Sequence, residues 1–288
     1  MNKMSRNIKL FFFFILSINI NIFCQPINNC EKYTKYNIVT KPNGFSYIFN
    51  VFDSENNKDI ATFEVKNCNF SNIEYHYPNL YVVRTSYGLK ELWLYSTFES
   101  YKIDDLIDFP FTVNNTQNLI AYFKKSNKFQ LVVKDLNRNI ETPVVLDSLP
   151  TQYISELISS LKWSTNYNIL WGFVGKGGSN SSYFFSYDYD KGVLTKYKVP
   201  LSLGDKFDLN PDLGLLLYSD FVYEFYDTES GIGPDIETTL FMYDFYKKTL
   251  KKIVSVMSNS NFLEISWICS DYYKYALPND NKLIIIKN

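Results

Sequence analysis

Four acidic residues at related positions are the strongest candidates for chemistry in this sequence. Glu74, Asp108, Asp208 and Glu264 each lie within three residues of a large apolar residue that recurs along the chain. Two carboxyl groups held about 5–10 Å apart can cleave glycosidic bonds, one acting as an acid and the other as a base or nucleophile. Glu74, Asp208 and Glu264 are therefore candidate catalytic residues of a glycoside hydrolase, if the fold brings two of them together.

Two other kinds of site are disfavoured by the residue pattern. His76 is the only histidine, and no Gly-x-Ser-x-Gly segment accompanies it. A Ser-His-Asp triad on a nucleophile elbow needs both, so we expect a structural hydrogen-bonding role for His76. Asp208–Asp212 alternates oxygen-bearing side chains as a calcium loop does, but Leu213 stands where such a loop needs Gly. The sequence predicts a turn there, with no metal and no cofactor.

The balance of charges excludes one class of partner. The 288 residues include 29 basic and 30 acidic ones, which gives a formal net charge of −1. Nucleic-acid binding needs a concentrated Lys/Arg surface. The one basic cluster, Lys247–Lys252, spans a predicted turn. We therefore expect no nucleic-acid partner.

The N-terminal residues have the layout of a secretory signal. Three basic residues precede the apolar stretch Leu10–Ile18, which is too short to span a membrane. We predict that residues 1–24 are a signal peptide and that residues 25–288 form a single mature domain, with an uncleaved signal anchor as the alternative. The protein would then be secreted or lie in the endolysosomal lumen, with no membrane span after removal of the signal.

Three Asn-x-Ser/Thr sequons are candidate glycosylation sites in a secreted protein. They begin at Asn69, Asn114 and Asn180. All three fall in predicted loops or at strand edges, which favours their being exposed. The sequence therefore predicts a glycoprotein.

The cysteines indicate one disulfide. Cys24 would leave with the signal peptide, so that Cys30, Cys68 and Cys269 remain. An oxidising compartment favours one disulfide with one cysteine left over. Cys30–Cys68 is the pair that is close in sequence, whereas a pair between Cys269 and an N-terminal cysteine would tie the two ends of the chain together.

The candidate residues stand on a strand-turn-strand unit that recurs five times. Each copy has a large apolar anchor residue, a polar turn and a run of apolar residues, and Phe207–Asp220 is the clearest copy. The four intervals between anchors cover 192 residues, an average of 48. The anchors are Tyr75, Phe111, Trp163, Leu209 and Trp267. Repeats of about 40–50 residues built only of strands are typical of propeller blades.

A second signature marks the third strand of each unit. Four such strands end in Asp, at Asp53, Asp135, Asp188 and Asp244. Asp suits this position because its side chain bonds nearby backbone N–H groups in a turn. Leu92–Ser96 and Leu283–Lys287 fit the pattern without Asp.

These units predict an all-β propeller with five or six four-stranded blades. The first hairpin lacks an anchor strand, and the last unit stops after its third strand. Pairing the two incomplete ends would remove exposed sheet edges. We therefore expect N- and C-terminal strands to close the ring within one blade.

The anchor turns resemble those of a known family. Leu209–Gly214 (LNPDLG), together with Trp163-Ser164 and Trp267, is similar to the Trp-Ser-Pro-Asp-Gly turn of TolB-like propellers and of the propeller domains of prolyl-oligopeptidase-type peptidases. The resemblance covers most of the chain after the signal. It implies the propeller fold and says little about function.

The function that this pattern favours is binding. A rigid ring that presents variable loops, without a recognisable catalytic set, is typical of an interaction module. We predict a secreted, non-catalytic propeller that binds an extracellular glycan or protein. The alternative is a glycoside hydrolase that uses acidic residues of the central channel.

Overall fold

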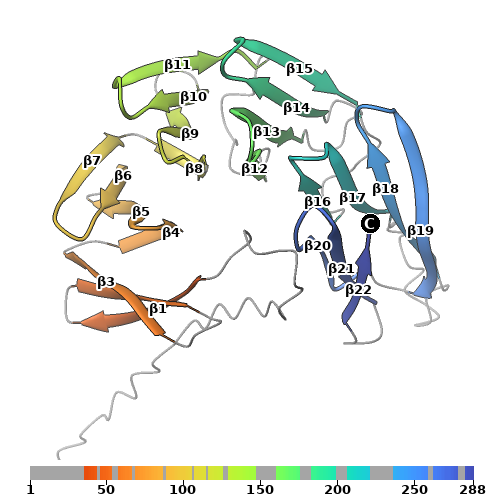
Figure 1. Cartoon of the computed structure of the whole chain (residues 1–288), viewed down its shortest axis with the longest axis horizontal. Coiled ribbons are helices and arrows are strands. Elements are labelled where there is room, and N and C mark those ends of the chain that lie inside the picture. Colours follow the sequence, from red (N-terminus) through yellow and green to blue (C-terminus); the bar gives the residue numbers. More distant parts are fainter. Residues whose placement is uncertain are drawn as a thin grey trace, which may run out of the picture.

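The chain forms strands throughout the part that the structure describes. The computed structural model describes residues 36–43, 46–53, 58–66, 69–86, 89–105, 107–114, 116–125, 129–146, 160–175, 183–198, 206–220, 236–258, 262–277 and 283–288. Within these ranges there are 22 strands and no helix. The strands form six antiparallel sheets that follow one another around an open centre (Figure 1). The all-β prediction is confirmed.

Sheets 2 to 5 have four strands each, and consecutive strands are neighbours. Sheet 2 comprises β4 (Asn69–His76), β5 (Asn79–Ser86), β6 (Leu89–Tyr95) and β7 (Ser100–Asp105), and sheet 3 comprises β8 (Ile107–Val113), β9 (Leu119–Lys125), β10 (Phe129–Asp135) and β11 (Ile140–Val144). Sheet 4 comprises β12 (Ser160–Trp163), β13 (Ile169–Val174), β14 (Tyr183–Asp188) and β15 (Val193–Tyr197), and sheet 5 comprises β16 (Phe207–Asn210), β17 (Leu215–Asp220), β18 (Ile236–Asp244) and β19 (Thr249–Ser258).

The first and last sheets have three described strands each. Sheet 1 comprises β1 (Tyr36–Asn43), β2 (Ser46–Asp53) and β3 (Lys58–Lys66), and sheet 6 comprises β20 (Glu264–Trp267), β21 (Tyr272–Ala276) and β22 (Leu283–Lys287). Within the described ranges, sheet 1 has no counterpart of the innermost strand of the other sheets, and sheet 6 has no counterpart of the outermost one. We expected strands from the two ends to share a blade. The described strands of the two ends belong to two separate sheets, and residues 1–35 lie outside the described part of the structure, so this closure stays a prediction.

The five predicted anchor units are the five innermost hairpins. They are β4–β5, β8–β9, β12–β13, β16–β17 and β20–β21. The second strand of each is the most apolar because both of its faces are covered: every residue from Leu215 to Ser219 on β17 is buried. In the sequence, such strands are continuous runs of apolar residues, without the alternation of apolar and polar residues of a half-buried strand.

The Asp signature makes the turn between the third and fourth strands. Asp135 Oδ1 accepts hydrogen bonds from the N–H groups of Asn137 and Arg138, both at 2.9 Å. Asp244 repeats this arrangement at the end of β18. On β6, where the sequence has no Asp, the Ser96 hydroxyl oxygen accepts from the N–H groups of residues 98 and 99. The predicted role of Asp as a turn residue is confirmed.

The hydrophobic core lies between the sheets and is divided among five clusters. Each cluster joins two consecutive sheets, from sheets 1 and 2 to sheets 5 and 6. In the cluster between sheets 4 and 5, Trp171 packs against Phe245 and Leu216. Among the described residues, no cluster joins sheet 6 to sheet 1.

Candidate functional site

The innermost strands position the acidic residues singled out in the sequence. Strands β4, β8, β12, β16 and β20 lie nearest the open centre (Figure 1). Glu74, Asp208 and Glu264 lie on β4, β16 and β20. Asp108 lies on β8, but its side chain is outside the described part of the structure.

Asp208 joins three consecutive sheets. One carboxylate oxygen pairs with the Lys162 ammonium on β12 of sheet 4. The other accepts a hydrogen bond of 2.8 Å from the Trp267 N–H on β20 of sheet 6. The Leu209 N–H donates at 2.9 Å to the first oxygen. Both oxygens are thus used to hold neighbouring inner strands together.

Glu74 has a similar position in another part of the ring. Its Oε2 accepts a hydrogen bond of 3.2 Å from the Val113 N–H on β8, the inner strand of the next sheet. The same oxygen lies 3.1 Å from His76 Nε2. His76 therefore has the kind of structural hydrogen bond that the sequence favoured, and the Glu74 carboxylate spans two sheets.

Glu264 is more exposed and bonds within its own sheet. Its Oε1 lies 2.5 Å from the Lys274 ammonium on β21, and its side chain is 46% exposed. The three predicted catalytic carboxylates thus lie in three different sheets, and each has its own partners. We find no acid and base arranged to share one substrate among these contacts.

The turns that follow the inner strands are bonded to one another from sheet to sheet. Asp212 accepts hydrogen bonds from the hydroxyls of Ser164 and Thr165, at 2.7 and 2.8 Å. The Asn114 amide donates to the Asn168 side chain at 3.2 Å. These partners are about 50 residues apart, so no local sequence signal could have paired them.

Two further pairs extend this series of turn contacts. Asn79 donates to Gln117 Oε1 at 2.9 Å, which joins sheets 2 and 3. Asn210 donates to the Cys269 carbonyl oxygen at 3.4 Å, which joins sheets 5 and 6. Asn210 also accepts from the N–H groups of Asp212 and Leu213, as the turn prediction for Asp208–Asp212 requires. Within the described residues, no group of three or more His, Cys, Asp or Glu side chains could hold a metal ion.

Known proteins resemble this chain in their structures, whereas the sequence comparisons find no match. No family model and no curated protein sequence matches the chain. An oligogalacturonate lyase in complex with manganese matches at a TM-score of 0.56, with 10% identity over 88% of this chain and 71% of that one. TolB from Acinetobacter baumannii matches at 0.52, with 13% identity over 88% of this chain and 60% of that one. The β-propeller domain of the Trilobed protease from Pyrococcus furiosus, described as having an open velcro topology, matches at a TM-score of 0.52. The identity is 13% over 87% of this chain and 76% of that one.

The fold is a β-propeller. At these identities the likeness concerns the fold alone, and the chain spans 60% of the length of the TolB structure. The resemblance to TolB-like and protease propellers is confirmed at that level. The six sheets are six blades, which we number as the sheets, so the larger of the two predicted blade counts describes them.

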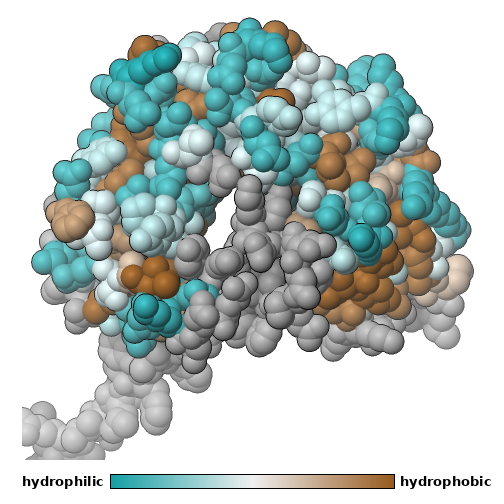
Figure 2. Space-filling view, in the orientation of Figure 1, coloured by the Kyte–Doolittle hydropathy of each residue, from teal (hydrophilic) through white to brown (hydrophobic). Residues whose placement is uncertain are grey.

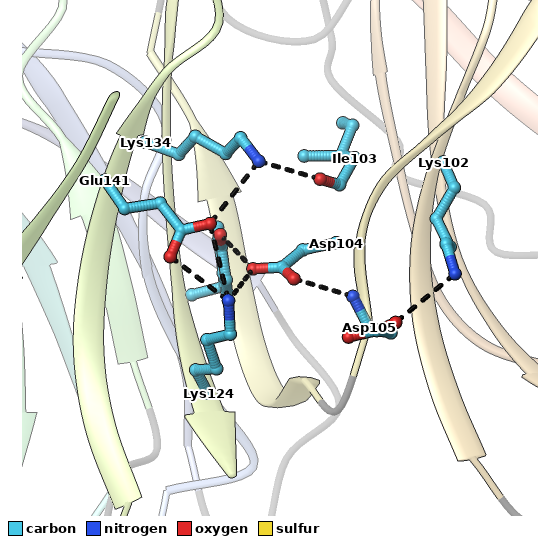
Figure 3. A network of polar contacts seen from close by, with 8 residues as sticks. Lys102, Ile103, Asp104, Asp105, Lys124, Lys134 and Glu141 are labelled. Atoms are coloured by element: carbon cyan, nitrogen blue, oxygen red, sulfur yellow. Dashed lines mark hydrogen bonds and ion pairs between the residues drawn. The ribbon is translucent and has the colours of Figure 1, made fainter. Parts of the chain in front are cut away.

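A charged network joins blades 2 and 3 of the propeller away from its centre (Figure 3). The Lys124 ammonium on β9 lies 2.8 Å from Asp104 on β7 and 3.1 Å from Glu141 on β11. The buried Lys134 donates to the Ile103 carbonyl oxygen at 2.9 Å. We interpret this network as a joint between blades, like the turn contacts.

Hydrogen bonding decides the ionisation of the network and of the turn residues. Burial would raise the pKa of Asp104, but hydrogen bonds from Lys124 and Tyr122 outweigh it, and the pKa lies below its ordinary value of 3.8. Burial would also raise the pKa of Asp244. Hydrogen bonds from Lys247 outweigh this effect, and the pKa of Asp244 is lowered as well. At Asp188 the hydrogen bond from the Lys191 ammonium is the main cause of a lowered pKa.

We expect the propeller to lose stability in acid through these three carboxylates. Their pKa values are lower in the folded chain than the ordinary value of 3.8, so the stability that they contribute is present above that pH and is lost as the pH falls below it. The urea midpoint should fall by about 1 M between pH 5 and pH 3. The double variant Asp188→Asn/Asp244→Asn should show a shallower decline, whereas the exposed-turn variant Glu99→Gln should follow the parent chain. An equal decline of the urea midpoint in the parent chain, the double variant and Glu99→Gln would contradict the role given to these carboxylates.

The three sequons differ in their surroundings. Asn69 is exposed at the start of β4. Asn114 is 2% exposed. Its amide nitrogen donates within the turn, and its oxygen accepts from the N–H groups of Asn118 and Leu119. Asn180 lies outside the described residues. Burial of Asn114 argues against the glycan predicted there, because a sugar on its nitrogen would displace these bonds.

We therefore expect a glycan at Asn69 and none at Asn114. In protein made by eukaryotic secretory cells, mass spectrometry should find Asn69 modified and Asn114 unmodified. Asn69→Gln should remove one glycan without a change in thermal stability. Asn114→Gln should lower the unfolding free energy by about 1–3 kcal/mol, because a longer side chain cannot keep the same buried bonds. A glycosylated Asn114 in folded protein would contradict this interpretation.

The predictions of a disulfide and of a signal peptide concern residues that lie mostly outside the described part of the structure. Cys269 is described and is 3% exposed, whereas Cys30 and Cys68 lie outside the described residues, as do residues 1–24. No helix in the described ranges is long and apolar enough to cross a membrane.

Proposed function

We propose that the chain is a secreted, non-catalytic propeller that binds an extracellular protein by strand addition to its last blade. The observation that carries this proposal is the edge of β22. This strand pairs only with β21 among the described residues, and it is a run of four large aliphatic residues followed by Lys287. An unpaired, apolar strand edge is a template for pairing with another chain.

The other blades show what a protected edge looks like in this protein. Their outermost strands contain charged residues or proline, which block pairing with another chain. These residues are Lys102, Asp104 and Asp105 on β7, Glu141 and Pro143 on β11, Lys196 on β15, and Lys251 and Lys252 on β19. The stretch from residue 283 to residue 286 on β22 has none. It has the composition of an interior strand, although no strand pairs with its outer edge among the residues that the structure describes.

The side chains of β22 also favour a protein over a glycan. Ile284 and Ile286 pack against the hydrophobic cluster shared by blades 5 and 6, while Leu283 and Ile285 are each 40% exposed. Hydrophobic surface gathers at the lower right of the molecule, where Figure 1 places the last two blades (Figure 2). An extended peptide would pair with the backbone groups of β22 that have no strand partner among the described residues, and it would cover this apolar face, whereas a glycan offers no strand to pair. Binding of a glycan is the other outcome that a test must address.

Arrays of extracellular domains and of glycans would test this function. We expect the mature chain to bind one or more extracellular domains, and Ile285→Lys to weaken that binding at least about tenfold, because a charge on the edge blocks strand addition. The matched control is Val193→Lys, at a side chain 50% exposed on β15, which already contains Lys196. It should leave binding within about twofold. Binding to glycans alone, or equal effects of both variants, would overturn the proposal.

Hydrolysis of glycans is the alternative, through Glu74, Asp208 and Glu264. Two of these carboxylates accept hydrogen bonds from backbone N–H groups of neighbouring inner strands. Such acceptors are committed to the fold, which supports binding over catalysis. A turnover screen on glycosides would favour the alternative if it found activity that Asp208→Asn and Glu264→Gln each abolish in folded protein.

Secretion is the other part of the proposal. It rests on the basic and apolar layout of residues 1–24. We expect export from eukaryotic cells and a mature N-terminus at or near Gln25. Retention of residues 1–24 on a membrane-bound product would instead support the signal-anchor alternative.

A further inference from the structure

We propose that the partner segment that adds to β22 is a strand that begins with two acidic residues and continues with apolar, β-branched ones. It runs antiparallel to β22, with its acidic residues beside Lys251 and Lys287 and its apolar residues against Val254 and Val256 of blade 5. This inference rests on the proposed function, because it names the chemistry of the partner at the same edge.

The direction of the added strand follows from the pairing in the other blades. In blades 2 to 5 the fourth strand is antiparallel to the third. β22 is the third strand of blade 6, and it runs toward the turn of residues 268–271, because Lys287 lies opposite Tyr272, the first residue of β21. A strand antiparallel to β22 therefore starts beside Lys287 and ends beside Leu283.

The apolar side of blade 5 sets the composition of the later part of the strand. Val254 lies opposite Leu240 on the ladder of β18 and β19, so the two side chains share the face that packs on blade 6. Val254 and Val256 are only partly buried against that cluster. In blade 4, Leu194 of the fourth strand packs against a cluster that contains Val144 of the preceding fourth strand. Aliphatic side chains on an added strand would cover Val254 and Val256 in the same way.

Two lysines at the other end of this surface have no carboxylate partner. Lys251 lies opposite Met242, which belongs to the cluster between blades 5 and 6, so Lys251 lies on the face of blade 5 that is turned to blade 6. Lys287 ends β22. Both lysines are exposed, and neither forms an ion pair within the described ranges. Three neighbouring lysines are already paired with a carboxylate of their own blade, namely Lys247, Lys252 and Lys274.

The unpaired charges around this end of the edge are positive in excess. Lys248, in the turn before β19, is a third exposed lysine that has no ion pair in the described part of the chain. Asp271 is the exposed acidic residue of the turn beside Lys287. One carboxylate thus stands against three unpaired lysines. An acidic segment is attracted to this end of β22, and a basic one is repelled.

Blade 3 shows the ion pair that an acidic residue would make in blade 6. Glu141 is the second residue of β11, the fourth strand, and it lies opposite Lys134 of the third strand. Its Oε1 lies 3.4 Å from the Lys134 ammonium. Lys287 has a comparable place at the end of the third strand of blade 6. Because successive residues of a strand point to opposite faces, two consecutive acidic residues can reach Lys287 on one face and Lys251 on the other.

Peptide binding to the purified chain tests the composition and direction of the partner strand. The probe is an N-acetylated peptide of two glutamates, four valines and two threonines, in that order. Calorimetry should show that it binds at least about fivefold more tightly than the same residues in reverse order, and than a peptide with lysines in place of the glutamates, because two partly exposed ion pairs together contribute about that factor. The difference should disappear in about 1 M salt.

Reversal of the two charges on the chain locates the acidic end. Lys251→Glu/Lys287→Glu should weaken binding of the glutamate peptide at least about tenfold and should favour the lysine peptide. The milder Lys251→Gln/Lys287→Gln should lie between this variant and the parent chain. The matched control is Lys198→Glu, at an exposed lysine of blade 4, which should leave the binding of both peptides within about twofold. Circular dichroism checks that each variant is folded.

The outcomes separate this proposal from the proposed function. Peptides that bind equally, whatever their order and charge, and that lose binding in Ile285→Lys would refute the acidic strand and leave strand addition standing. Failure of every peptide to bind at millimolar concentration would also overturn the acidic strand, and the array of extracellular domains then decides strand addition on its own. A dimer in sedimentation that Ile285→Lys abolishes would show that a second copy of the chain takes the edge, which overturns the acidic partner as well.

Discussion

Replacing Trp171 by alanine should lower the unfolding free energy by about 3–5 kcal/mol, the range for removing a fully buried aromatic side chain. Trp171 lies on β13 and is 0% exposed. Its ring stacks on that of Tyr197, with 5.3 Å between the ring centroids, and its centroid lies at the same distance from that of Phe245. The alanine variant would open a cavity between blades 4 and 5, which share this cluster. Urea denaturation followed by circular dichroism measures the loss.

Trp171→Phe is the matched control. Phenylalanine keeps an aromatic ring in the cluster and removes the indole N–H, which is buried without a hydrogen-bond partner in the structure. We expect a loss of only about 1–2 kcal/mol, because a smaller cavity is partly offset by the removal of an unsatisfied donor. A loss below about 1 kcal/mol for the alanine variant would show that this interface is not tightly packed.

Replacing Asp208 by alanine should lower the unfolding free energy by about 2–3 kcal/mol, because it leaves two backbone N–H groups and an ammonium without their acceptor. The Asp208 side chain is 16% exposed and that of Lys162 is 37% exposed. Water can reach Lys162, so the cost should stay below that of breaking a fully buried ion pair. The loss would confirm that one carboxylate holds three inner strands together.

Conservative variants separate this structural role from catalysis. Asp208→Asn keeps one acceptor oxygen and should cost about half as much as alanine. Lys162→Met combined with Asp208→Ala should show a coupling energy above about 1 kcal/mol, since the two side chains interact directly. An Asp208→Asn variant of unchanged stability that loses measurable glycosidase turnover would contradict the structural role and support the catalytic one.

The local parts of the fold were predictable from the sequence. The five anchor hairpins and the Asp turns were identified because each depends on residues only a few positions apart. Asp244, for example, needs only the N–H groups of Tyr246 and Lys247 to make its turn. A run of apolar residues such as Leu215–Tyr218 likewise predicts a strand covered on both faces.

The partners of the candidate site residues were not predictable in this way. Asp208 stood out as acidic and close to an anchor, but its contacts to Lys162 and Trp267 bridge 46 and 59 positions of sequence. Asn114 matched a glycosylation sequon, although its amide is buried in a turn. Both properties depend on how one blade packs on the next, which a single repeat does not encode.

The sequence by itself determined that this chain is a strand-built repeat whose acidic residues recur beside its anchors, because turn chemistry and apolar runs are local. Only the tertiary structure decided what those residues do. It placed the Glu74 and Asp208 carboxylates against backbone N–H groups of neighbouring blades. It also left the apolar strand β22 with no partner but β21 among the described residues. The physical reason is that hydrogen-bond partners and exposed edges belong to the assembled ring, where residues about 50 positions apart come within 3 Å of each other.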